Sequence, residues 1–455
     1  MNLSREAHRS LGFKLMVVAG CALLSSGCGT PEAVEPRINQ GAPSLLDTLP
    51  QESAGARSWI QGGALRDTGF GGYGGHALVA YDDEGHVVTV ENADVTGEAK
   101  VRKLAPDGSE VFSRSFRAPP YSTMSFRVLE VDAAGNILLT GRANGPWDLL
   151  GGVSGQDSFI AKLDPSGNRL WGRYTRPAAG TRFEFRGLAV KAGGEIVAIS
   201  VLERLSDETG KVMITQYDGQ TGAPQWDRIL GPDTSEAYPW QPRAMSIAVD
   251  DADNIYLAGD VTDGIDFGNA VLTSDCTRIE CRRGFLASLD AAGNHRWSRL
   301  VNGSPGELVL RGSVAAVAIW RPRDAENAGP RNFLMAWARE TGAERWSHLI
   351  SRDEFVKPFI ASTRDGEILV VRNLGDERVN ARYQLSRFLE DGSLASTFTH
   401  QSPTLFQVLS FDAAPRGKAI AVSGTYQESS PDLNVPFDPS GWHHEGQFTM
   451  QVVTP

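Results

Sequence analysis

The sequence predicts an all-β protein: a seven-bladed β-propeller of four-stranded antiparallel blades that an N-terminal strand closes. Two long segments repeat the same two phrases, and short Asp/Gly turns recur at matching places in further segments. A lone strand-like segment near the N-terminus can complete the last unit. A ring of four-stranded blades leaves only short, protected sheet edges, so units of this kind can close into one domain.

The repeated unit is clearest where residues 131–141 match residues 249–259, in the pattern Val-Asp-x-Ala-x-Asn-Ile-x-Leu-x-Gly. Residues 159–171 and 285–297 share a second phrase that ends in tryptophan. Short apolar runs on either side of an Asp/Gly/Asn turn are hairpin signals. The unit therefore reads as strand, tight turn, strand, longer loop, strand, tight turn and strand, over roughly 50 to 60 residues.

Five further segments follow this order with less regular phrases. Four of them carry an aromatic residue where a fourth strand is expected, at Phe112, Trp226, Trp346 and Phe398. The last segment lacks a fourth strand, and residues 57–60, with Trp59, resemble the missing one. We therefore expect residues 57–455 to form one propeller that the N-terminal strand closes.

The two clear copies resemble the bacterial seven-bladed propeller repeat family. The phrases at 221–226 and 341–346, Thr-Gly followed by tryptophan, look like the repeats of quinoprotein (PQQ-like) propellers. The resemblance implies the fold and says little about activity, because one fold hosts many functions. Cys276 and Cys281 are not adjacent, unlike the cysteine pair of quinone-dependent dehydrogenases. We therefore expect no cofactor.

The N-terminus reads as an export signal. Three cations, Arg5, Arg9 and Lys14, precede an uncharged stretch at 15–24 that is too short to span a bilayer, which needs about 20 residues. The stretch ends in Leu-Ser-Ser-Gly before Cys28, which resembles the lipobox of bacterial lipoproteins. Residues 1–27 would then be a lipoprotein signal peptide.

The resemblance implies that Cys28 carries the lipid. An earlier match at Cys21 and an ordinary cleaved signal are the alternatives. Gly29 and Thr30 follow Cys28, with no aspartate, which by resemblance to enterobacterial sorting suggests the outer membrane. Residues 28–56 are rich in Pro, Ala and Ser without a sustained period, so we expect a flexible stalk.

Composition limits the class of partner. The 455 residues are 41% hydrophobic and 22% charged, which excludes wholesale disorder. A formal net charge of −11 argues against a nucleic-acid partner, because neutralising phosphates requires a basic face. We expect a monomer held at the membrane by its lipid, with an envelope protein or a glycan as its partner.

The variable connections of such blades all lie on one face, and variable loops on a rigid scaffold are usual binding places. The aromatic residues of these loops are candidates for contact with protein or carbohydrate. They are Trp147, Tyr238, Trp240 and Trp442, the last beside His443. His443, His444 and Glu445 lack the spacing of a metal motif, so we expect no metal there.

Cations and cysteines complete the candidate face. Arginines recur just ahead of the expected first strands, at Arg127, Arg186, Arg243 and Arg311, and could line the mouth of the channel or be ordinary surface residues. Cys276 and Cys281 are expected to form a disulfide, since exported chains meet an oxidising space. This bridge would present Arg278 on the same face.

No catalytic motif stands out. The chain has no Gly-x-Ser-x-Gly elbow, no His-Glu-x-x-His pair and no phosphate-binding glycine loop. The sequence therefore favours a non-catalytic cell-envelope lipoprotein that uses the loop-rich face as a binding or scaffold module. The alternatives are a propeller enzyme acting on polysaccharide or alcohol, and an outer-membrane assembly factor.

Overall fold

A computed structural model describes most of the body of the chain. The described residues are 57–64, 78–92, 97–175, 180–204, 210–231, 243–261, 264–268, 270–273, 283–321, 331–352, 358–363, 366–373, 382–401, 406–414, 419–427 and 445–453. Everything below refers to these ranges.

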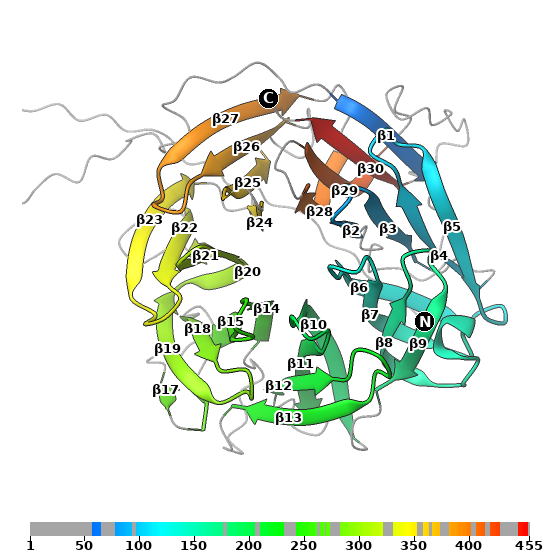
Figure 1. Cartoon of the computed structure of the whole chain (residues 1–455), viewed down its shortest axis with the longest axis horizontal. Helices are drawn as coiled ribbons and strands as arrows, with labels where there is room; N and C mark the ends of the chain where they lie inside the picture. Colours follow the sequence, from blue (N-terminus) through cyan, green and yellow to red (C-terminus); the bar gives the residue numbers. More distant parts are fainter. Residues whose placement is uncertain are drawn as a thin grey trace, which may run out of the picture. The chain divides into compact units, whose positions relative to one another are not determined.

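The described strands form a ring of antiparallel sheets (Figure 1). There are seven four-stranded sheets among them, numbered here one to seven from β2, and one small two-stranded sheet. The innermost strands contact one another in sequence, β2 to β6, β10, β14, β20, β24 and β28, and β28 contacts β2 again. This closed circuit of inner strands confirms the predicted all-β propeller with four-stranded antiparallel blades.

The first four sheets follow the chain from the inside of the ring outward. Their strands are β2 (Leu78–Tyr81), β3 (Val87–Glu91), β4 (Glu98–Leu104) and β5 (Glu110–Arg117); β6 (Thr123–Val131), β7 (Ile137–Asn144), β8 (Gln156–Leu163) and β9 (Arg169–Tyr174); β10 (Thr181–Val190), β11 (Ile196–Arg204), β12 (Gly210–Tyr217) and β13 (Pro224–Leu230); and β14 (Arg243–Val249), β15 (Ile255–Val261), β18 (Arg283–Leu289) and β19 (His295–Asn302).

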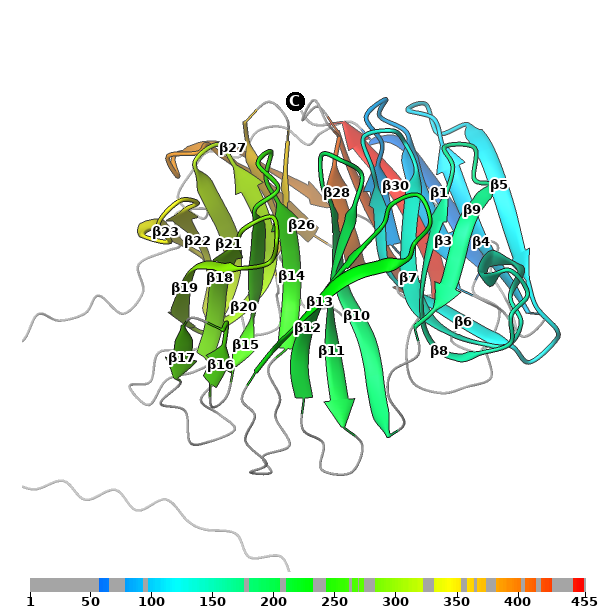
Figure 2. The same ribbon diagram turned by 60° about the horizontal axis from the view of Figure 1, so that its bottom comes forward.

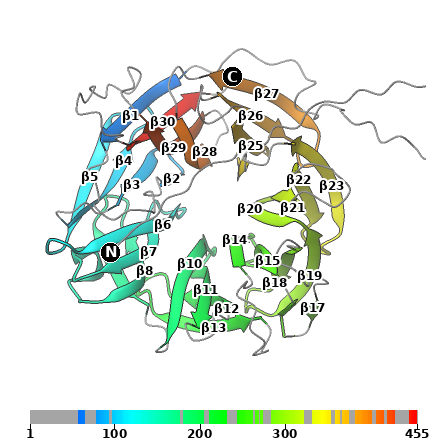
Figure 3. The ribbon, with the colours of Figure 1, turned by 180° about the vertical axis from the view of Figure 1, so that it is seen from behind.

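The other three sheets keep the same order, as the view from behind also shows (Figure 3). Their strands are β20 (Ser304–Arg311), β21 (Val314–Arg321), β22 (Arg331–Ala338) and β23 (Glu344–Ser351); β24 (Phe359–Ser362), β25 (Ile368–Asn373), β26 (Arg382–Phe388) and β27 (Leu394–Gln401); and β28 (Phe406–Ala413), β29 (Ala419–Gln427), β30 (Glu445–Val453) and β1 (Arg57–Ala64). Between β15 and β18 lies the hairpin of β16 (Gly264–Asp266) and β17 (Val271–Thr273), and between β7 and β8 the 3-10 helix η2 (Asp148–Leu150).

The two ends of the body share sheet seven. β1 pairs antiparallel with β30, from Trp59 opposite Gln451 to Ala64 opposite Gly446. Strands from the N-terminal and C-terminal ends of the described chain therefore lie side by side in one sheet. No helix within the described ranges has both the length and the apolar character needed to cross a membrane.

The Asp/Gly turns are held by their own backbone hydrogen bonds and, in addition, by hydrogen bonds to the aspartate side chain. In the β6–β7 turn, Oδ1 of Asp132 accepts the N–H groups of Ala134 and Asn136, at 3.0 and 2.8 Å. Gly135 supplies the left-handed residue, with φ of 78°. Asp250 makes the same contacts in the β14–β15 turn. Because consecutive strands of each sheet run antiparallel, the first-to-second and third-to-fourth strand turns lie at the same end of the sheet. The side view shows the sheets standing side by side around the ring (Figure 2). We call this end the short-turn face.

Neighbouring sheets are joined by the aromatic residue of the outer strand. Trp297 on β19 packs its ring on Gly342 in the β22–β23 turn of the next sheet, and its Nε1–H donates to the carbonyl oxygen of Arg339 at 2.8 Å. Trp171 and Gly222 repeat the arrangement between sheets two and three. The glycine of the Thr-Gly motif in one sheet and the tryptophan of the preceding sheet are thus the two partners of one contact between sheets.

Candidate binding surfaces

Trp147 is a buried anchor and does not belong to an exposed binding face. Its side chain is inaccessible to solvent, and its Nε1–H donates to the carbonyl oxygens of Asn144 and Thr123 at 3.0 and 3.2 Å. The predicted exposure was wrong because the segment after β7 folds back as η2. Trp147, Leu149 and Leu150 of this loop pack into the core that sheets one and two share.

The anchor joins two connections on the face opposite the short turns. The bond from Trp147 to Thr123 ties the β7–β8 connection to the start of β6, and Oδ1 of Asp148 accepts the N–H of Arg117 at 2.8 Å. Gly145 lies between the two connections: its Cα packs against Ser122, and its N–H donates to the carbonyl oxygen of Gly155 at 2.9 Å. The β5–β6 link and the β7–β8 connection therefore form one bonded unit.

Two segments of this unit contain no charged side chain, although Asp148 of η2 is exposed and the Arg169 guanidinium lies beside Gly151. We define the neutral platform as residues 118–122 and 151–156, which contain no ionisable group other than the phenol of Tyr121. Tyr121 is 86% exposed and Val153 is 52% exposed. Tyr121 also has φ of 68°, which is unusual for a residue with a side chain and is found at functional loops. Sequence reasoning missed Tyr121, although its place after two prolines in an inter-blade link could have indicated it.

Arg127 and Arg186 lie within the inner strands β6 and β10 and not ahead of them, as was expected, and these strands bring the two arginines together. Each is the extra residue of a β-bulge in an inner strand, between Phe126 and Val128 in β6 and between Phe185 and Gly187 in β10. Both contact Glu184 on β10, at 3.5 Å from Arg127 and 3.1 Å from Arg186. A bulge redirects the side chain of its extra residue, so the shared register of these two arginines has a structural cause.

Arg311 does not lie ahead of a first strand, as expected, but ends one. It is the last residue of β20, opposite Val314, and is therefore next to a short turn on the face opposite the variable connections. The expectation was wrong because the link into sheet five is short: β19 ends at Asn302 and β20 begins at Ser304. Gly303, with φ of 115°, makes this reversal possible.

Three carboxylates lie on inner strands of different sheets. They are Glu130 on β6, Glu307 on β20 and Asp412 on β28. Burial by the surrounding protein raises the pKa of Glu130 to about 8, and the charges of Asp412 and Glu307 add to this shift. Burial also raises the pKa of Glu307 to about 7 and that of Asp412 to about 6, although backbone N–H groups oppose both shifts.

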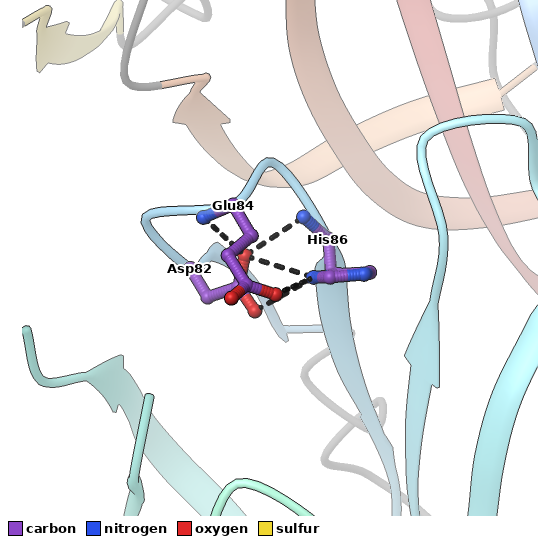
Figure 4. A group of neighbouring side chains, drawn as sticks. All are labelled: Asp82, Glu84 and His86. Carbon is purple, nitrogen blue, oxygen red and sulfur yellow. Dashed lines mark hydrogen bonds and ion pairs between the residues drawn. The ribbon is translucent and has the colours of Figure 1, made fainter. Parts of the chain in front are cut away.

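The turn between β2 and β3 brings together Asp82, Glu84 and His86 (Figure 4). Nδ1 of His86 lies 2.9 Å from Oδ2 of Asp82 and 3.5 Å from Glu84. The oxygens of Asp82 are already engaged, however, since Oδ1 accepts the N–H groups of Glu84 and His86 and Oδ2 lies 2.8 Å from Nζ of Lys103. A metal ion would have to displace this buried ammonium group, so the residues fit a braced turn better than a metal centre.

The bracing cation is a feature that sequence reasoning missed. Lys103 pairs with Asp82 in sheet one, and Lys162 pairs with Asp132 at 3.0 Å in sheet two. In sheet three the lysine moves to the turn, where Nζ of Lys191 donates to Oε1 of Gln216 at 2.6 Å. The signal was present in sheets one and two, where lysine precedes the last apolar residue of the third strand and the first turn carries Asp82 or Asp132. Sheet four has Ser288 at the lysine position, and Arg339 pairs with its Asp250 at 2.8 Å instead.

Several predicted site residues fall outside the described part of the chain and stay predictions. They are Cys28, Tyr238, Trp240, Cys276, Arg278, Cys281, Trp442 and His443, together with the side chain of Arg243. The predicted Cys276–Cys281 disulfide, the signal peptide at 1–27 and the stalk at 28–56 are therefore untested by the fold.

Comparisons with known proteins show distant likeness alone. No family model matches the chain, and no curated protein matches it. Solved structures that are similar include BamB from Moraxella catarrhalis, with 15% identity over 82% of this chain and 84% of that one and a TM-score of 0.40. BBS1N in complex with ARL6DN has 11% identity, coverage of 88% and 97%, and a TM-score of 0.44.

A quinohemoprotein alcohol dehydrogenase from Comamonas testosteroni is also similar, with 10% identity, coverage of 87% and 76%, and a TM-score of 0.38. At these values the likenesses carry no argument about function. The assignment of the fold rests on the closed circuit of inner strands, and the function has to be argued from the surfaces of this chain.

Proposed function

We propose that this protein is a non-catalytic cell-envelope lipoprotein, anchored through Cys28, whose loop-rich face binds another envelope protein. The observation that carries this proposal is the neutral platform. It combines an exposed tyrosine, a scaffold fixed by the buried Trp147 and two segments without charged side chains, in a chain whose net charge is −11.

The platform has the properties of a protein-binding patch. Tyrosine is enriched at interface hot spots, because it offers a large ring at a small cost in conformational entropy. Tyr121 is held on a braced loop, so little further ordering is needed on binding. Absence of charge lowers the cost of desolvation, and it also predicts that binding depends weakly on salt.

The short-turn face is a poor alternative. The first aspartate of its turns is used internally, as Asp132 and Asp250 accept backbone N–H groups of their own turns. Asp132 is further paired with a buried lysine. The hydrogen bonds of these two side chains are satisfied within the chain itself, so they stabilise the turns and do not need a binding partner.

Photo-crosslinking in intact cells tests the proposal. A photoreactive phenylalanine analogue replaces Tyr121 in one version of the full chain and the exposed Asp251 of the short-turn face in the matched control. We expect one defined protein adduct from position 121, none from 251, and loss of the adduct when Val153→Lys places a charge on the platform. Equal adducts at both positions, or an adduct insensitive to Val153→Lys, would remove the platform from the proposal.

A further inference from the structure

The outer strands of four consecutive sheets carry the same short motif. In β5, β9, β13 and β19 an aromatic residue is followed two positions later by arginine. We define the arginine rim as these four residues, Arg114, Arg173, Arg228 and Arg299, each of which lies opposite an apolar residue of the third strand. The corresponding residue of sheet five is His348, so the series of arginines ends at sheet four.

The arginines of the rim are held by the next sheet without being neutralised. Nε and Nη2 of Arg173 donate to the carbonyl oxygen of Thr221 at 3.0 and 2.9 Å. Nε of Arg299 donates to the carbonyl oxygen of Gly342 at 3.0 Å. Among the described residues, neither arginine forms an ion pair with a carboxylate. Both guanidinium groups are therefore fixed in position and keep their full positive charge.

The other two arginines of the rim have acidic neighbours. Arg114 lies close enough to Asp164, and Arg228 to Asp290, for their charges to interact. Both aspartates belong to turns of the following sheet. Arg173 and Arg299 are therefore the two positions at which an anionic ligand would meet the least competition.

The exposed surface of these four strands is basic, in a chain whose net charge is −11. Arg117 pairs with Glu98, and Glu110 with Arg102, both at 3.1 Å. The other exposed ionisable side chains of the four strands are Arg169, Arg173, Asp227, Arg228, Arg296 and Arg299. These strands contain no lysine. Arginine offers a planar fork of N–H donors that matches an oxyanion, so this composition favours a ligand with carboxylate or phosphate groups.

Exposed aliphatic side chains accompany the arginines. Ile229 is 55% exposed and Leu300 is 39% exposed. Each lies three residues after the tryptophan of its strand, so by strand alternation it faces the preceding sheet while the arginine faces the following one. Ile229 therefore faces the sheet that carries Arg173, and Leu300 faces the sheet that carries Arg228. A ligand along these strands would meet charged and apolar groups in turn.

The shape of the ring distinguishes between classes of anionic ligand. Figure 1 shows β5, β9, β13 and β19 following one another around the outside of the ring. A planar surface such as a bilayer touches the outside of a ring at one or two neighbouring sheets only. A linear polymer can follow the curvature and reach an arginine on each sheet. The repeated arginines therefore fit a polymer better than a membrane.

We propose that the arginine rim binds an acidic polysaccharide of the cell envelope, through the carboxylates of several sugar units at once. Alternating carboxylates and C–H faces along such a polymer match the arginines and aliphatic side chains of the rim. Each exposed contact is weak by itself, and linking several contacts along one chain raises the overall affinity. The choice of an envelope polymer rests on the proposed envelope location, whereas the rim is a different surface from the neutral platform.

Titration of the full chain in an uncharged detergent with polygalacturonate tests the proposal. We expect the wild type to bind this polymer and not neutral dextran of equal length. Arg173→Gln combined with Arg299→Gln should weaken binding about tenfold, whereas Arg173→Lys with Arg299→Lys should stay within about threefold, because lysine keeps the charge. A role in bracing the sheets alone would give no such difference in binding between glutamine and lysine.

The matched control removes two exposed arginines from other strands. Arg142 lies on β7 and Arg182 on β10, and Arg142→Gln with Arg182→Gln changes the net charge by the same amount. We expect the control pair to bind polygalacturonate as the wild type does. An equal loss in the control pair, or no binding by the wild type, would overturn the proposal.

A second measurement needs no variant, in case the glutamine pair does not fold. The wild type should bind an oligogalacturonate long enough to reach several sheets at least about tenfold more tightly than one that reaches a single arginine. Equal affinities would overturn the proposal, as would preference for anionic over neutral vesicles without binding to polygalacturonate. Loss of the crosslink at position 121 with polygalacturonate binding intact would count against the protein-binding platform alone.

Discussion

At the scale of single residues, two independent constraints require glycine at position 342, in the turn between the third and fourth strands of sheet five. Gly342 has φ of 65°, and the Trp297 ring of the preceding sheet lies against it. A Cβ added there would come 2.5 Å from an atom of that ring. Gly194 has φ of 89° and no atom within 4 Å of the same hypothetical Cβ. Alanine substitutions at Gly194 and Gly342 therefore separate the cost of backbone strain from the cost of disturbing the contact between sheets.

We expect Gly194→Ala to cost about 1–2 kcal/mol, which is the price of a left-handed conformation. Gly342→Ala should cost about 1–3 kcal/mol more, because the tryptophan has to move. Chemical denaturation of both variants measures the difference. Equal losses would mean that the ring of Trp297 gives way freely and does not brace the neighbouring sheet.

At the scale of elements, the β1 strand gives the sharpest test of how sheet seven is built. Deleting residues 57–64 removes the outer strand of sheet seven and exposes the edge of β30 that pairs with it. We expect this truncation to lower the melting temperature strongly, whereas deletion of 29–50 leaves it unchanged. Circular dichroism during heating measures both, and equal melting temperatures would show that the β1–β30 pairing adds no stability.

Elements with local signals could be predicted from sequence. The Asp132 and Asp250 turns were recognised because aspartate and asparagine four residues apart hold such turns, with Gly135 or Asp253 at the left-handed position. Trp147 was misjudged because its partner Thr123 lies 24 residues away and nothing next to the tryptophan indicates η2. Arg311 was misplaced because the one-residue link at Gly303 is shorter than the other links suggested.

The candidate sites were harder to predict than the fold. The bulges that orient Arg127 and Arg186 depend on pairing with the neighbouring strand, which the sequence of one strand does not contain. Glu130 and Asp412 become conspicuous only when the inner strands are aligned by register, since each looks like an ordinary polar residue within an apolar run. Tyr121 could be identified only from its exposed area and its positive φ, and the sequence contains neither quantity.

At the scale of the whole molecule, the proposed lipid anchor at Cys28 determines whether the propeller is attached to the membrane. Cys28→Ala should release the chain from the membrane fraction and abolish incorporation of a labelled fatty acid, because no other cysteine would be available at the processing site. Cys21→Ala is the matched control and should leave both unchanged. Labelling that survives Cys28→Ala and disappears in Cys21→Ala would move the anchor to the earlier cysteine.

Pairing of β1 with β30 also has a consequence for the order of synthesis. The strand made first must wait for the strand made last, because Trp59 sits opposite Gln451 in the finished sheet. The loop-closure entropy of such a distant pair rises only slowly with length, so stability tolerates the arrangement. Folding of sheet seven is nevertheless delayed until β30 has been synthesised. Circular permutation that opens the chain in the β6–β7 turn, with a linker from the end of β30 to β1, would make all four strands of sheet seven contiguous. Such a permutant should form that sheet faster while keeping the same set of contacts.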